Sequence, residues 1–531
     1  MADRFTSLLG IVNRTGLLDP RRVPSLAAAT ARWGPTVAAP YAASALASPN
    51  RTAVIDDSGD VSYADLDRRS TQLAKGLHRL GVRRGERLGI ACRNHRDFIE
   101  LTVAAAKAGL GVVYLNTSFA APQMREVVGR EGLAVLALDL DLLHLIDHGA
   151  FDAPVIIAGP DEPTRTALAD NVRTMSEVRR DGDHGGPLRA SLPVPPVLLT
   201  SGTTGTPKGA QRSNRVDPTA ATAIIDRIPY RHDDVIAITS PLFHAWGLAQ
   251  MLLASALGAT TTLIASFDVD ATLAQIERER VTVLAVVPAI LQRLLASPAL
   301  DTTDLSSLRI VASSGSALPV PVVQEWLDRV GPNLYNLYGS TEVGQATLAT
   351  PDDLAVEPAT AGRALPGSVI AILDEGGTDV DPGTIGRIFV GSGAQFEQYT
   401  GGGGKEIIGG LMSSGDVGYV RSDGLLFVTG RADDMIVSGG ENVFPREVED
   451  LLLAHPAIDD VAVVGVDDPE FGQRLAAYVV KADGARLSAT AVRRLVSDTL
   501  ARHKTPRDVH FVSELPRTAT GKIRRNQLDR G

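Results

Sequence analysis

The stretch LLTSGTTGTPKG, at residues 198–209 of a 531-residue chain, decides the fold. It combines three glycines and one lysine, Lys208, with several hydroxyl side chains. Glycine lets the backbone approach a ligand closely, so that main-chain N–H groups converge on anionic oxygens, and Lys208 adds a point charge. The apolar residues 197–199 indicate a buried strand that leads into this loop. The composition therefore predicts a phosphate-binding loop.

Two competing interpretations of this stretch have to be weighed. A flexible surface loop rich in glycine and threonine would have a similar composition, and composition alone does not separate the two. The Walker-type pattern G-x-x-x-x-G-K-[ST] fails here, because Pro207 stands where the glycine before the lysine belongs. Gly209 also replaces the serine or threonine of that pattern. The stretch is therefore not a Walker-type P-loop.

The same stretch resembles, almost residue for residue, the Thr-Ser-Gly-Thr-Thr-Gly-x-Pro-Lys-Gly signature of the adenylate-forming superfamily. That superfamily comprises acyl-CoA synthetases, luciferases and peptide-synthetase adenylation domains. The resemblance implies that this loop binds ATP and AMP. The implied residues are Thr200, Ser201, Gly202, Thr203, Thr204, Gly205 and Lys208.

Length and composition favour a soluble protein of two or more domains. A chain of 531 residues is too long for one ordinary core, and its 44% hydrophobic and 21% charged residues are typical of globular proteins. The single cysteine, Cys92, excludes a disulfide framework or a cysteine-based metal site. We expect Cys92 to be a buried apolar residue, and the protein to be cytoplasmic.

Charge and hydropathy also exclude some partners. The net charge of −10 argues against nucleic-acid binding. The first ten residues do not resemble a signal peptide. The longest apolar run, residues 251–267, is short and interrupted by polar residues, so we expect no transmembrane helix. Peripheral membrane contact and a homodimer are left open.

Strand-like and helical runs alternate along most of the chain, which predicts an α/β fold with parallel sheets. Residues 87–91 and 111–115 are candidate buried strands, and the leucines within residues 63–80 follow helical spacing. Further short β-rich runs follow the glycine loop at residues 235–239, 261–265, 281–287, 308–312 and 334–337.

The pattern changes towards the C-terminus. We predict a large N-terminal domain of parallel α/β sheets over residues 1–430, with a β-rich subdomain at about residues 385–429. A small, mobile α+β C-terminal lid domain follows over residues 434–531. Residues 431–433 form the predicted hinge between the two domains.

The stretch YNLYGSTE, residues 335–342, follows a predicted strand, at the usual ligand edge of an open α/β sheet. It could be an ordinary turn, but it matches the Tyr-Gly-x-Thr-Glu motif of the superfamily. The resemblance implies that Tyr338 stacks on adenine, Thr341 contacts the α-phosphate and Glu342 ligates Mg²⁺. SGSA at residues 314–317 resembles the loop that faces adenine. These motifs add Gly315, Ser316, Ala317 and Gly339 to the implied AMP-binding residues.

A ribose site is implied by Asp416, in a Ser-Gly-Asp triplet, and by Arg431, in a Gly-Arg pair. A carboxylate can accept hydrogen bonds from both ribose hydroxyls, and arginine can donate to the sugar oxygens. Asp433 matches the hinge position of the superfamily. Taken alone, Asp416 is an ordinary turn residue and Asp433 a solvated linker charge.

Three further motifs distinguish activities within the superfamily. MIVSGGEN, residues 435–442, resembles the loop that binds the pantetheine arm of CoA, through Ser438, Gly439, Gly440 and Glu441. Val437 departs from the pattern, because relatives often carry lysine there. PRTATGKI, residues 516–523, matches the catalytic-lysine motif and implies that Lys522 bridges carboxylate and α-phosphate. PLFHAWG, residues 241–247, resembles the acyl-pocket motif, with His244 near the carboxylate. A buried core histidine is the commoner alternative.

The resemblance implies an ATP-dependent acyl-CoA synthetase, most like the bacterial fatty-acid–CoA ligases. A carboxylic acid is activated as acyl-AMP, and the acyl group passes to CoA as co-substrate. The implied catalytic residues are Lys522, Glu342, Thr341 and His244, with Mg²⁺ as the metal. Two alternatives stay open: an acyl-AMP ligase that loads a carrier protein, and a nonenzymatic nucleotide sensor. A medium- or long-chain fatty acid is preferred by resemblance alone.

Overall fold

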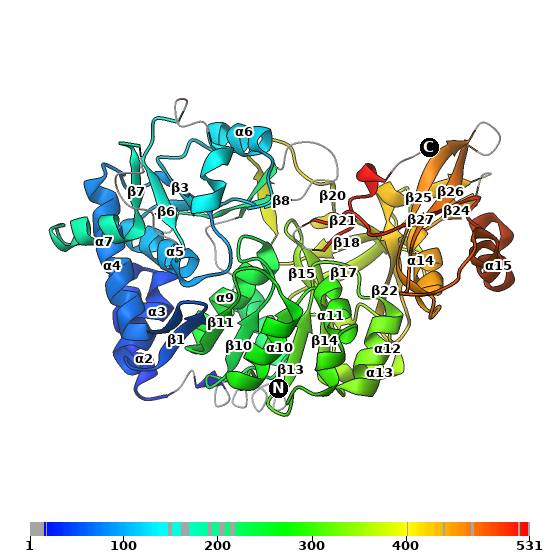
Figure 1. Ribbon diagram of the computed structural model, residues 1–531, viewed down its shortest axis with the longest axis horizontal. Coiled ribbons are helices and arrows are strands. Elements are labelled where there is room, and N and C mark those ends of the chain that lie inside the picture. The colour runs from blue at the N-terminus through cyan, green and yellow to red at the C-terminus, as the bar shows by residue number, and fades with distance from the viewer. Residues whose placement is uncertain are drawn as a thin grey trace. The chain divides into compact units, whose positions relative to one another are not determined.

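The computed structural model divides into two compact units (Figure 1). Unit 1 comprises Met1–Val286, Ala296–Ala312 and Ala394–Gly404, and unit 2 comprises Val287–Leu295, Ser313–Gly393 and Lys405–Gly531. We describe each unit by itself. The structure describes residues 15–16, 19–146, 151–160, 169–188, 194–200, 208–212, 218–393, 395–400, 402–438, 441–468, 472–518 and 521–528.

Unit 1 contains an eight-stranded sheet in the order β19-β9-β8-β4-β3-β5-β6-β7. All pairs from β8 to β7 are parallel, while β9 is antiparallel to both β8 and β19. The strands are β3 (Arg87–Ala91), β4 (Gly111–Tyr114), β5 (Val135–Asp139), β6 (Val155–Ala158), β7 (Val172–Thr174), β8 (Val197–Thr200), β9 (Lys208–Arg212) and β19 (Phe396–Tyr399). The helices between them are α4 (Tyr63–Arg79), α5 (Arg96–Ala108), α6 (Ala121–Glu131) and α7 (Met175–Asp183), with the 3-10 helix η1 (Leu140–Leu145).

A second group of strands in unit 1 follows the order β2-β1-β11-β10-β12. Only β2 is antiparallel to its neighbour. The strands are β1 (Thr52–Asp56), β2 (Gly59–Ser62), β10 (Val235–Ile238), β11 (Thr260–Leu263) and β12 (Val283–Val286). The accompanying helices are α2 (Arg22–Trp33), α3 (Ala38–Ala47), α8 (Pro218–Arg227), α9 (Ala245–Leu257), α10 (Val269–Arg278) and η3 (Pro298–Asp301).

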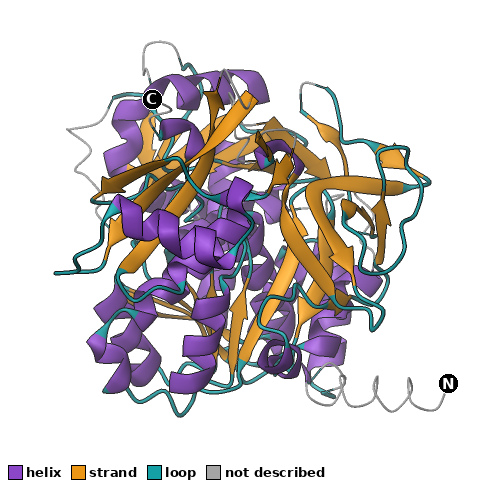
Figure 2. Ribbon diagram, turned by 90° about the vertical axis from the view of Figure 1, so that its right-hand side faces the viewer, coloured by secondary structure: helices purple, strands orange, loops and turns teal. Residues whose placement is uncertain are grey.

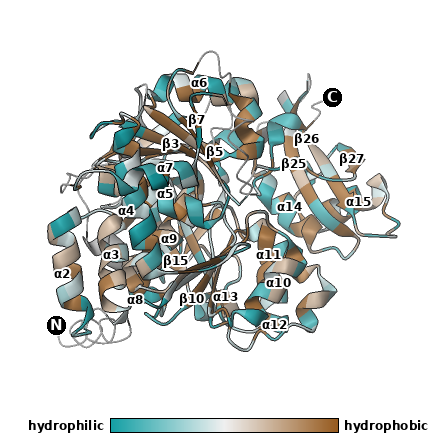
Figure 3. Cartoon of the chain, turned by 60° about the vertical axis from the view of Figure 1, so that its left-hand side comes forward, coloured by the Kyte–Doolittle hydropathy of each residue, from teal (hydrophilic) through white to brown (hydrophobic). Residues whose placement is uncertain are grey.

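The core of unit 1 lies on both faces of its parallel strands. Every residue of β5 is buried, as is every residue of β6, because helices cover both faces of such a sheet. Figure 3 shows the resulting contrast, with apolar colouring along strands such as β3 and polar colouring on the outer surface of α6 and α7. The near-continuous apolar runs in the sequence follow from this two-sided burial.

Figure 2 shows helices and strands packed together throughout the described chain. The strands of unit 2 fall into three groups. The first is an antiparallel run of β14 (Leu334–Ser340), β15 (Gly344–Ala349) and β16 (Arg363–Ala364). The second is a five-stranded antiparallel sheet of β17 (Val369–Leu373), β18 (Gly386–Gly391), β20 (Ile407–Ile408), β21 (Leu411–Val420) and β22 (Leu426–Arg431). The helices are α11 (Pro288–Leu295), α12 (Val320–Arg329) and α13 (Pro351–Val356), and β13 (Ile310–Ser313) crosses the boundary of the two units in the sequence.

The third group of unit 2 is the C-terminal α+β sheet, in the order β24-β23-β26-β25 with β27 beside β26. Its core lies between this sheet and its helices, around Val448, Val463 and Val496. The elements are β23 (Ile436–Ser438), β24 (Glu441–Val443), α14 (Pro445–Leu453), β25 (Ile458–Asp468), β26 (Gly472–Lys481), α15 (Ala489–Thr499) and β27 (Asp508–Val512). The 3-10 helices are η4 (Ala432–Asp434), η5 (Arg502–Lys504) and η6 (Arg525–Gln527).

These elements confirm the predicted α/β fold class, with parallel sheets and a smaller α+β part at the C-terminus. The domain boundary at residue 430 and the hinge at residues 431–433 stay predictions. Two strands depart from the predicted β-rich subdomain at residues 385–429. β17 pairs with β18 and extends that sheet before residue 385. β19 pairs with β9 in unit 1, because strand pairing here joins segments far apart in the sequence.

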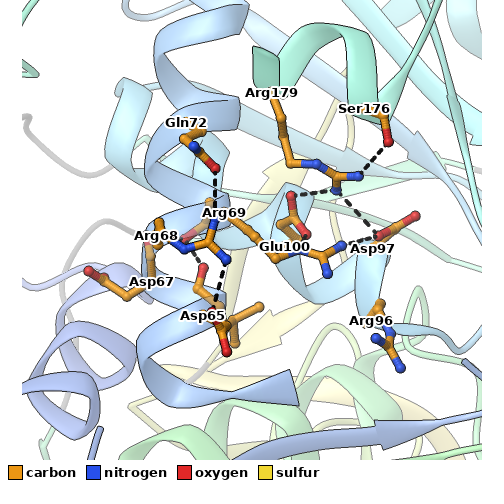
Figure 4. Close-up of polar contacts among 12 residues, drawn as sticks. Asp65, Asp67, Arg68, Arg69, Gln72, Arg96, Asp97, Glu100, Ser176 and Arg179 are labelled. Carbon is orange, nitrogen blue, oxygen red and sulfur yellow. Dashed lines mark hydrogen bonds and ion pairs between the residues drawn. The ribbon is translucent and has the colours of Figure 1, made fainter. Parts of the chain in front are cut away.

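A buried ion-pair cluster joins α4, α5 and α7 in unit 1 (Figure 4). Glu100 is only 1% exposed, and its two carboxylate oxygens accept hydrogen bonds from Arg69 and Arg179, each at 2.9 Å. Glycines let α4 and α7 approach this closely, since a Cβ on Gly76 would lie 2.0 Å from the carbonyl oxygen of Val178. The cluster therefore ties three helices together at a point where charge is out of water.

Replacing Glu100 with leucine should destabilise the protein markedly, because Arg69 and Arg179 then lose their main anionic partner in a buried position. We expect a loss of roughly 3 kcal/mol or more in the free energy of unfolding, measured by urea denaturation. Arg68→Gln, which removes an exposed pair with Asp65, is the control and should cost at most about 1 kcal/mol. Equal effects of the two variants would contradict this assignment.

Candidate active site

Residues from three separate sequence motifs meet in unit 2 around the carboxylate of Asp416. β21 and β22 pair so that Asp416 stands directly opposite Arg431, with 3.5 Å between Asp416 Oδ1 and Arg431 Nη1. The hydroxyl of Tyr338, on β14, donates to Asp416 Oδ2 at 2.6 Å. The structure thus brings together the three side chains that the sequence assigned to adenine and ribose.

Burial raises the pKa of Asp416, although the hydrogen bond from Tyr338 and the positive charges of Arg431 and Lys522 oppose this shift. A carboxylate in such a place needs hydrogen-bond donors to stay charged. The contacts with Tyr338 and Arg431 leave part of the acceptor capacity of Asp416 unused, since two carboxylate oxygens offer about four lone-pair positions. It can therefore accept further hydroxyl donors.

The predicted hinge residue Asp433 is paired with Arg431 through two parallel hydrogen bonds. Arg431 Nε donates to Asp433 Oδ1 at 2.8 Å, and Nη2 donates to Oδ2 at 3.1 Å. Partial burial alone would raise the pKa of Asp433, but the hydrogen bonds and charge of Arg431 lower it overall. Arg431 is therefore shared between Asp416 and Asp433, the predicted sugar ligand and the predicted hinge.

Lys522 lies on a tight turn near the C-terminus. Thr518 N donates to Lys522 O at 2.7 Å, and Gly521 adopts a positive φ of 76°, which favours glycine. The Lys522 side chain keeps contact with solvent, yet the surrounding protein lowers the pKa of its ammonium group by desolvation, and Arg431 lowers it further. Asp416 and Glu342 act in the opposite direction. These interactions place the predicted catalytic lysine within electrostatic reach of both carboxylates.

Glu342 lies in the tight connection between β14 and β15, which Ser340 stabilises. The Ser340 hydroxyl donates to Glu342 Oε2 at 3.0 Å and accepts from the N–H groups of Glu342 and Val343, each at 3.2 Å. Thr341 lies in the same connection. A carboxylate beside a hydroxyl suits Mg²⁺, which commonly combines one or two carboxylates with water and substrate phosphates. The residues present therefore fit the predicted metal.

The YGSTE motif differs from its prediction in one respect. The strand was expected to end near Leu337, but β14 continues to Ser340 because it pairs with the antiparallel β15. Tyr338 and Gly339 therefore lie within a strand. A Cβ on Gly339 would lie 2.1 Å from the carbonyl oxygen of Gly344, so no larger residue fits that pairing.

The predicted adenine-facing loop follows β13. Ser314 Oγ donates to the carbonyl oxygen of Leu337 at 2.8 Å, which fixes the loop to β14 one residue before Tyr338. Gly315 has a φ of 94°, a conformation that favours glycine. Ser316 and Ala317 follow directly. The hydrogen bond of Ser314 therefore fixes the backbone just before Gly315, Ser316 and Ala317, the three predicted loop residues.

The predicted phosphate loop belongs to unit 1, and its residues 201–207 lie outside the described part of the chain, including Ser201, Gly202, Thr203, Thr204 and Gly205. Its two ends are described: Thr200 and Lys208 pair across the antiparallel strands β8 and β9. The loop therefore connects two strands, whereas a Walker-type loop leads from a strand into a helix. Lys208 Nζ lies 5.4 Å from the ring centroid of Tyr399 on β19.

The predicted acyl-pocket motif begins α9, also in unit 1. His244 precedes the first helical residue, and its ring centroid lies 4.6 Å from that of Phe243. The indole N–H of Trp246 donates to the carbonyl oxygen of Val286 at 3.0 Å. The second half of the motif therefore belongs to the first turn of α9, and Trp246 joins it to β12.

The predicted pantetheine loop is a β-hairpin. Ser438 on β23 pairs with Glu441 on β24, and the two glycines between them, Gly439 and Gly440, lie outside the described residues. Val437, the departure from the pattern, pairs with Asn442 in the same hairpin.

Sequence reasoning missed Lys405, which the structure places beside this site. A Cβ on Gly415 would lie 3.3 Å from Lys405 Nζ and 3.2 Å from Arg431 Nη2. The charge of Lys405 also contributes to the lowered pKa of Asp433. Lys405 follows a run of glycines that resembled a loop tip, so nothing in the local sequence indicated its position.

Comparisons with known proteins show the family of the chain. The family model described as AMP-binding enzyme matches residues 41–400, and the model described as AMP-binding enzyme C-terminal domain matches residues 447–522. The chain is 35% identical to the indoleacetate–CoA ligase of Aromatoleum aromaticum, over 90% of this chain and 95% of the relative. It is 29% identical to a long-chain-fatty-acid–CoA ligase of Mycobacterium tuberculosis, over 91% and 96% of the two chains.

Among solved structures, ATP-bound MatB from Rhodopseudomonas palustris is similar, with a TM-score of 0.82 and 26% identity. The similarity covers 92% of this chain and 98% of that one. None of the helices within the described ranges is long and apolar enough to cross a membrane.

Replacing Gly339 with alanine should distort the β14–β15 hairpin, because the new Cβ would overlap the carbonyl of Gly344. Tyr338 and Glu342 flank the distortion, so we expect a lower unfolding temperature together with at least tenfold weaker binding of AMP, measured by calorimetry. Gly129→Ala in α6 is the control, since a Cβ there meets nothing within 4 Å and alanine favours the helix by up to about 1 kcal/mol. Unchanged AMP binding in Gly339→Ala would refute the assigned role of this hairpin.

Proposed function

Because the chain belongs to the AMP-binding enzyme family, we propose that it is an ATP-dependent, AMP-forming acid–thiol ligase. One observation carries the proposal: Tyr338, Asp416 and Arg431 come from separate parts of the sequence and meet at the Asp416 carboxylate. The charges of Asp416 and Glu342 also act on the pKa of Lys522. A lysine, a sugar-binding carboxylate and a metal-binding carboxylate are what adenylate formation needs in one place.

The nucleotide would be held by unit 2 side chains. Tyr338 would present its ring to adenine, and Gly339 follows it in the chain. Gly315, Ser316 and Ala317 belong to the loop that Ser314 fixes to β14. Asp416 accepts hydrogen bonds from the ribose hydroxyls, and Arg431 donates to the sugar oxygens. The loop between Thr200 and Lys208 would surround the phosphates. Glu342 would hold Mg²⁺, which neutralises phosphate charge when it is bound, and Thr341 would contact the α-phosphate.

In the first step, a carboxylate oxygen of the acid attacks the α-phosphorus of ATP. The bond to pyrophosphate breaks, and acyl-AMP forms. The barrier is mostly electrostatic, since one anion attacks a polyanion, so a positive charge aligned with both groups lowers it. Lys522 supplies that charge, and His244 would lie near the reacting carboxylate.

In the second step, the sulfur of CoA attacks the acyl carbonyl carbon, the thiol loses its proton and AMP leaves. We propose that the C-terminal part turns about Asp433 between the two steps. The hairpin of Ser438, Gly439, Gly440 and Glu441 would then guide the pantetheine arm. The pairing of Arg431 with Asp433 supports a hinge there, because breaking that pair would free both residues.

The substrate is proposed to be an arylalkanoic or related aromatic acid. The first relative named above is an indoleacetate–CoA ligase, and it is the more identical of the two reported. A medium- or long-chain fatty acid is the second candidate, because the other relative is a long-chain-fatty-acid–CoA ligase that matches over a similar length. We further propose that the protein acts in the cytoplasm.

The test is the release of AMP and pyrophosphate over a panel of carboxylic acids, each measured with and without CoA. The panel should include indoleacetate, a cinnamic acid, and C8 and C16 fatty acids. AMP that appears together with acyl-CoA for one acid class supports the ligase and names its substrate. Pyrophosphate release that does not respond to CoA favours delivery to a carrier protein, and no turnover with any acid favours a nucleotide sensor.

Lys522→Ala should separate the two steps. Without its ammonium group, the acid-dependent exchange of pyrophosphate should fall by at least a hundredfold. Conversion of supplied acyl-AMP and CoA to acyl-CoA should stay within about threefold of the unchanged protein, because the carboxyl group is already activated. Arg524→Ala, two residues further on, is a control for general damage to this segment. Equal loss of both activities would contradict the assignment of Lys522 to the adenylation step.

The pH dependence of acyl-AMP formation should also depend on the charge of Lys522. The pKa of Lys522 is lowered, so this lysine loses its positive charge at a lower pH than an ordinary lysine, whose pKa is about 10.4. As the pH rises through that lowered value, kcat/KM for ATP in pyrophosphate exchange should fall. Conversion of supplied acyl-AMP should not fall in the same range. Parallel alkaline losses in both assays would contradict the assignment.

A further inference from the structure

Asn94 lies between β3 and α5 in unit 1. Three hydrogen bonds of its side-chain amide go to one segment of the chain. Asn94 is only 5% exposed. Its Nδ2 donates to the carbonyl oxygens of Ile238 at 3.2 Å and Ser240 at 2.9 Å, and its Oδ1 accepts from the N–H of Leu242 at 2.9 Å. An asparagine side chain has two N–H donors and one carbonyl, so all three polar directions face the same segment.

That segment connects β10 to α9 and includes Pro241 and Leu242, the first two residues of the PLFHAWG motif. His244 N donates to the carbonyl oxygen of Pro241 at 3.1 Å, which continues the fixed backbone into the motif. From the other side, Gly247 of α9 packs against the same loop, since a Cβ there would lie 2.3 Å from Pro241 O. Asn94 and Gly247 therefore hold the backbone before His244 from two directions.

Asn94 is itself held by its neighbours. Asp139, the last residue of β5, accepts hydrogen bonds from Arg93 N at 3.1 Å and Arg93 Nη1 at 2.9 Å, and its other oxygen lies 2.9 Å from His95 Nε2. Burial raises the pKa of the adjacent Cys92 thiol, so its neutral form completes this buried group. Arg93 and His95, on both sides of Asn94, are thus fixed to β5. Through Asn94, the position of the sheet also determines the position of residues 238–242.

We propose that Asn94 is a positioning residue for the carboxylic acid substrate, acting through the backbone of residues 238–244. The inference rests on the proposed function, in which the PLFHAWG motif lines the acid site. A loop between a strand and a helix lacks the regular backbone bonds of either element, so its position depends on side chains such as Asn94. Displacing a substrate-binding group by about 1 Å can cost a hundredfold in rate.

Asn94→Leu, of similar size but without polar atoms, tests the inference. In acid-dependent pyrophosphate exchange we expect the KM for the acid to rise at least tenfold, or the order of preference within the acid panel to change. The KM for ATP should stay within about twofold, because the three hydrogen bonds of the Asn94 amide go to residues 238–242 before His244. Tyr230→Phe is the matched control. It removes a buried hydrogen bond to Gln250, further along α9, and should leave both KM values unchanged.

Gly247→Ala disturbs the same loop from its other side and should produce the same selective change. It also serves, with Asn94→Ser, if Asn94→Leu fails to fold. A lower unfolding temperature with an unchanged KM for the acid, or equal changes in both KM values, would overturn the inference by showing a purely structural role. If the unchanged protein shows no acid-dependent exchange with any acid, the proposed function itself fails, and the substrate role of Asn94 fails with it.

Discussion

The pairing of β21 with β22 is the constraint on which the nucleotide side of the site depends. Its register sets Asp416 opposite Arg431, and every other group of the cluster is arranged around that pair. Tyr338 reaches Asp416 from β14, and Arg431 extends its remaining donors to Asp433. A slip of one residue in an antiparallel pair moves each side chain to the opposite face. The register therefore determines whether the proposed sugar site can form.

Desolvation by the surrounding protein shifts the pKa values of two charged residues, Asp416 and Lys522, in opposite directions. It raises the pKa of Asp416 and lowers the pKa of Lys522, so both shifts favour the neutral forms. Each residue counteracts the shift of the other through its charge. A polyanion such as ATP beside Lys522 would act in the same direction as Asp416 and raise the pKa of the lysine. The chemistry is thus linked to binding, because the charge on Lys522 is best supported when an anion lies beside it.

Much of the fold could be predicted because two-sided burial leaves a plain signal in the sequence. β3 was predicted at residues 87–91 and occupies those residues. The signal fails where pairing partners decide the structure. The end of β14 depends on β15, and the place of β19 depends on β9, neither of which local apolar patterns reveal. Asn94 and Lys405 were missed for the same reason, since their surroundings come from segments far away in the chain.

The two halves of the proposed chemistry rest on different kinds of support. Nucleotide groups such as Tyr338, Asp416 and Arg431 lie on paired strands, whose hydrogen-bond ladders fix them. His244 instead follows a loop that Asn94 and Gly247 hold from either side. Strand-borne groups suit a substrate that stays the same, as ATP does. A braced loop can be re-shaped by a few substitutions without disturbing any ladder. This division explains, in physical terms, how one family can keep its nucleotide chemistry while its members act on acids as different as indoleacetate and long-chain fatty acids.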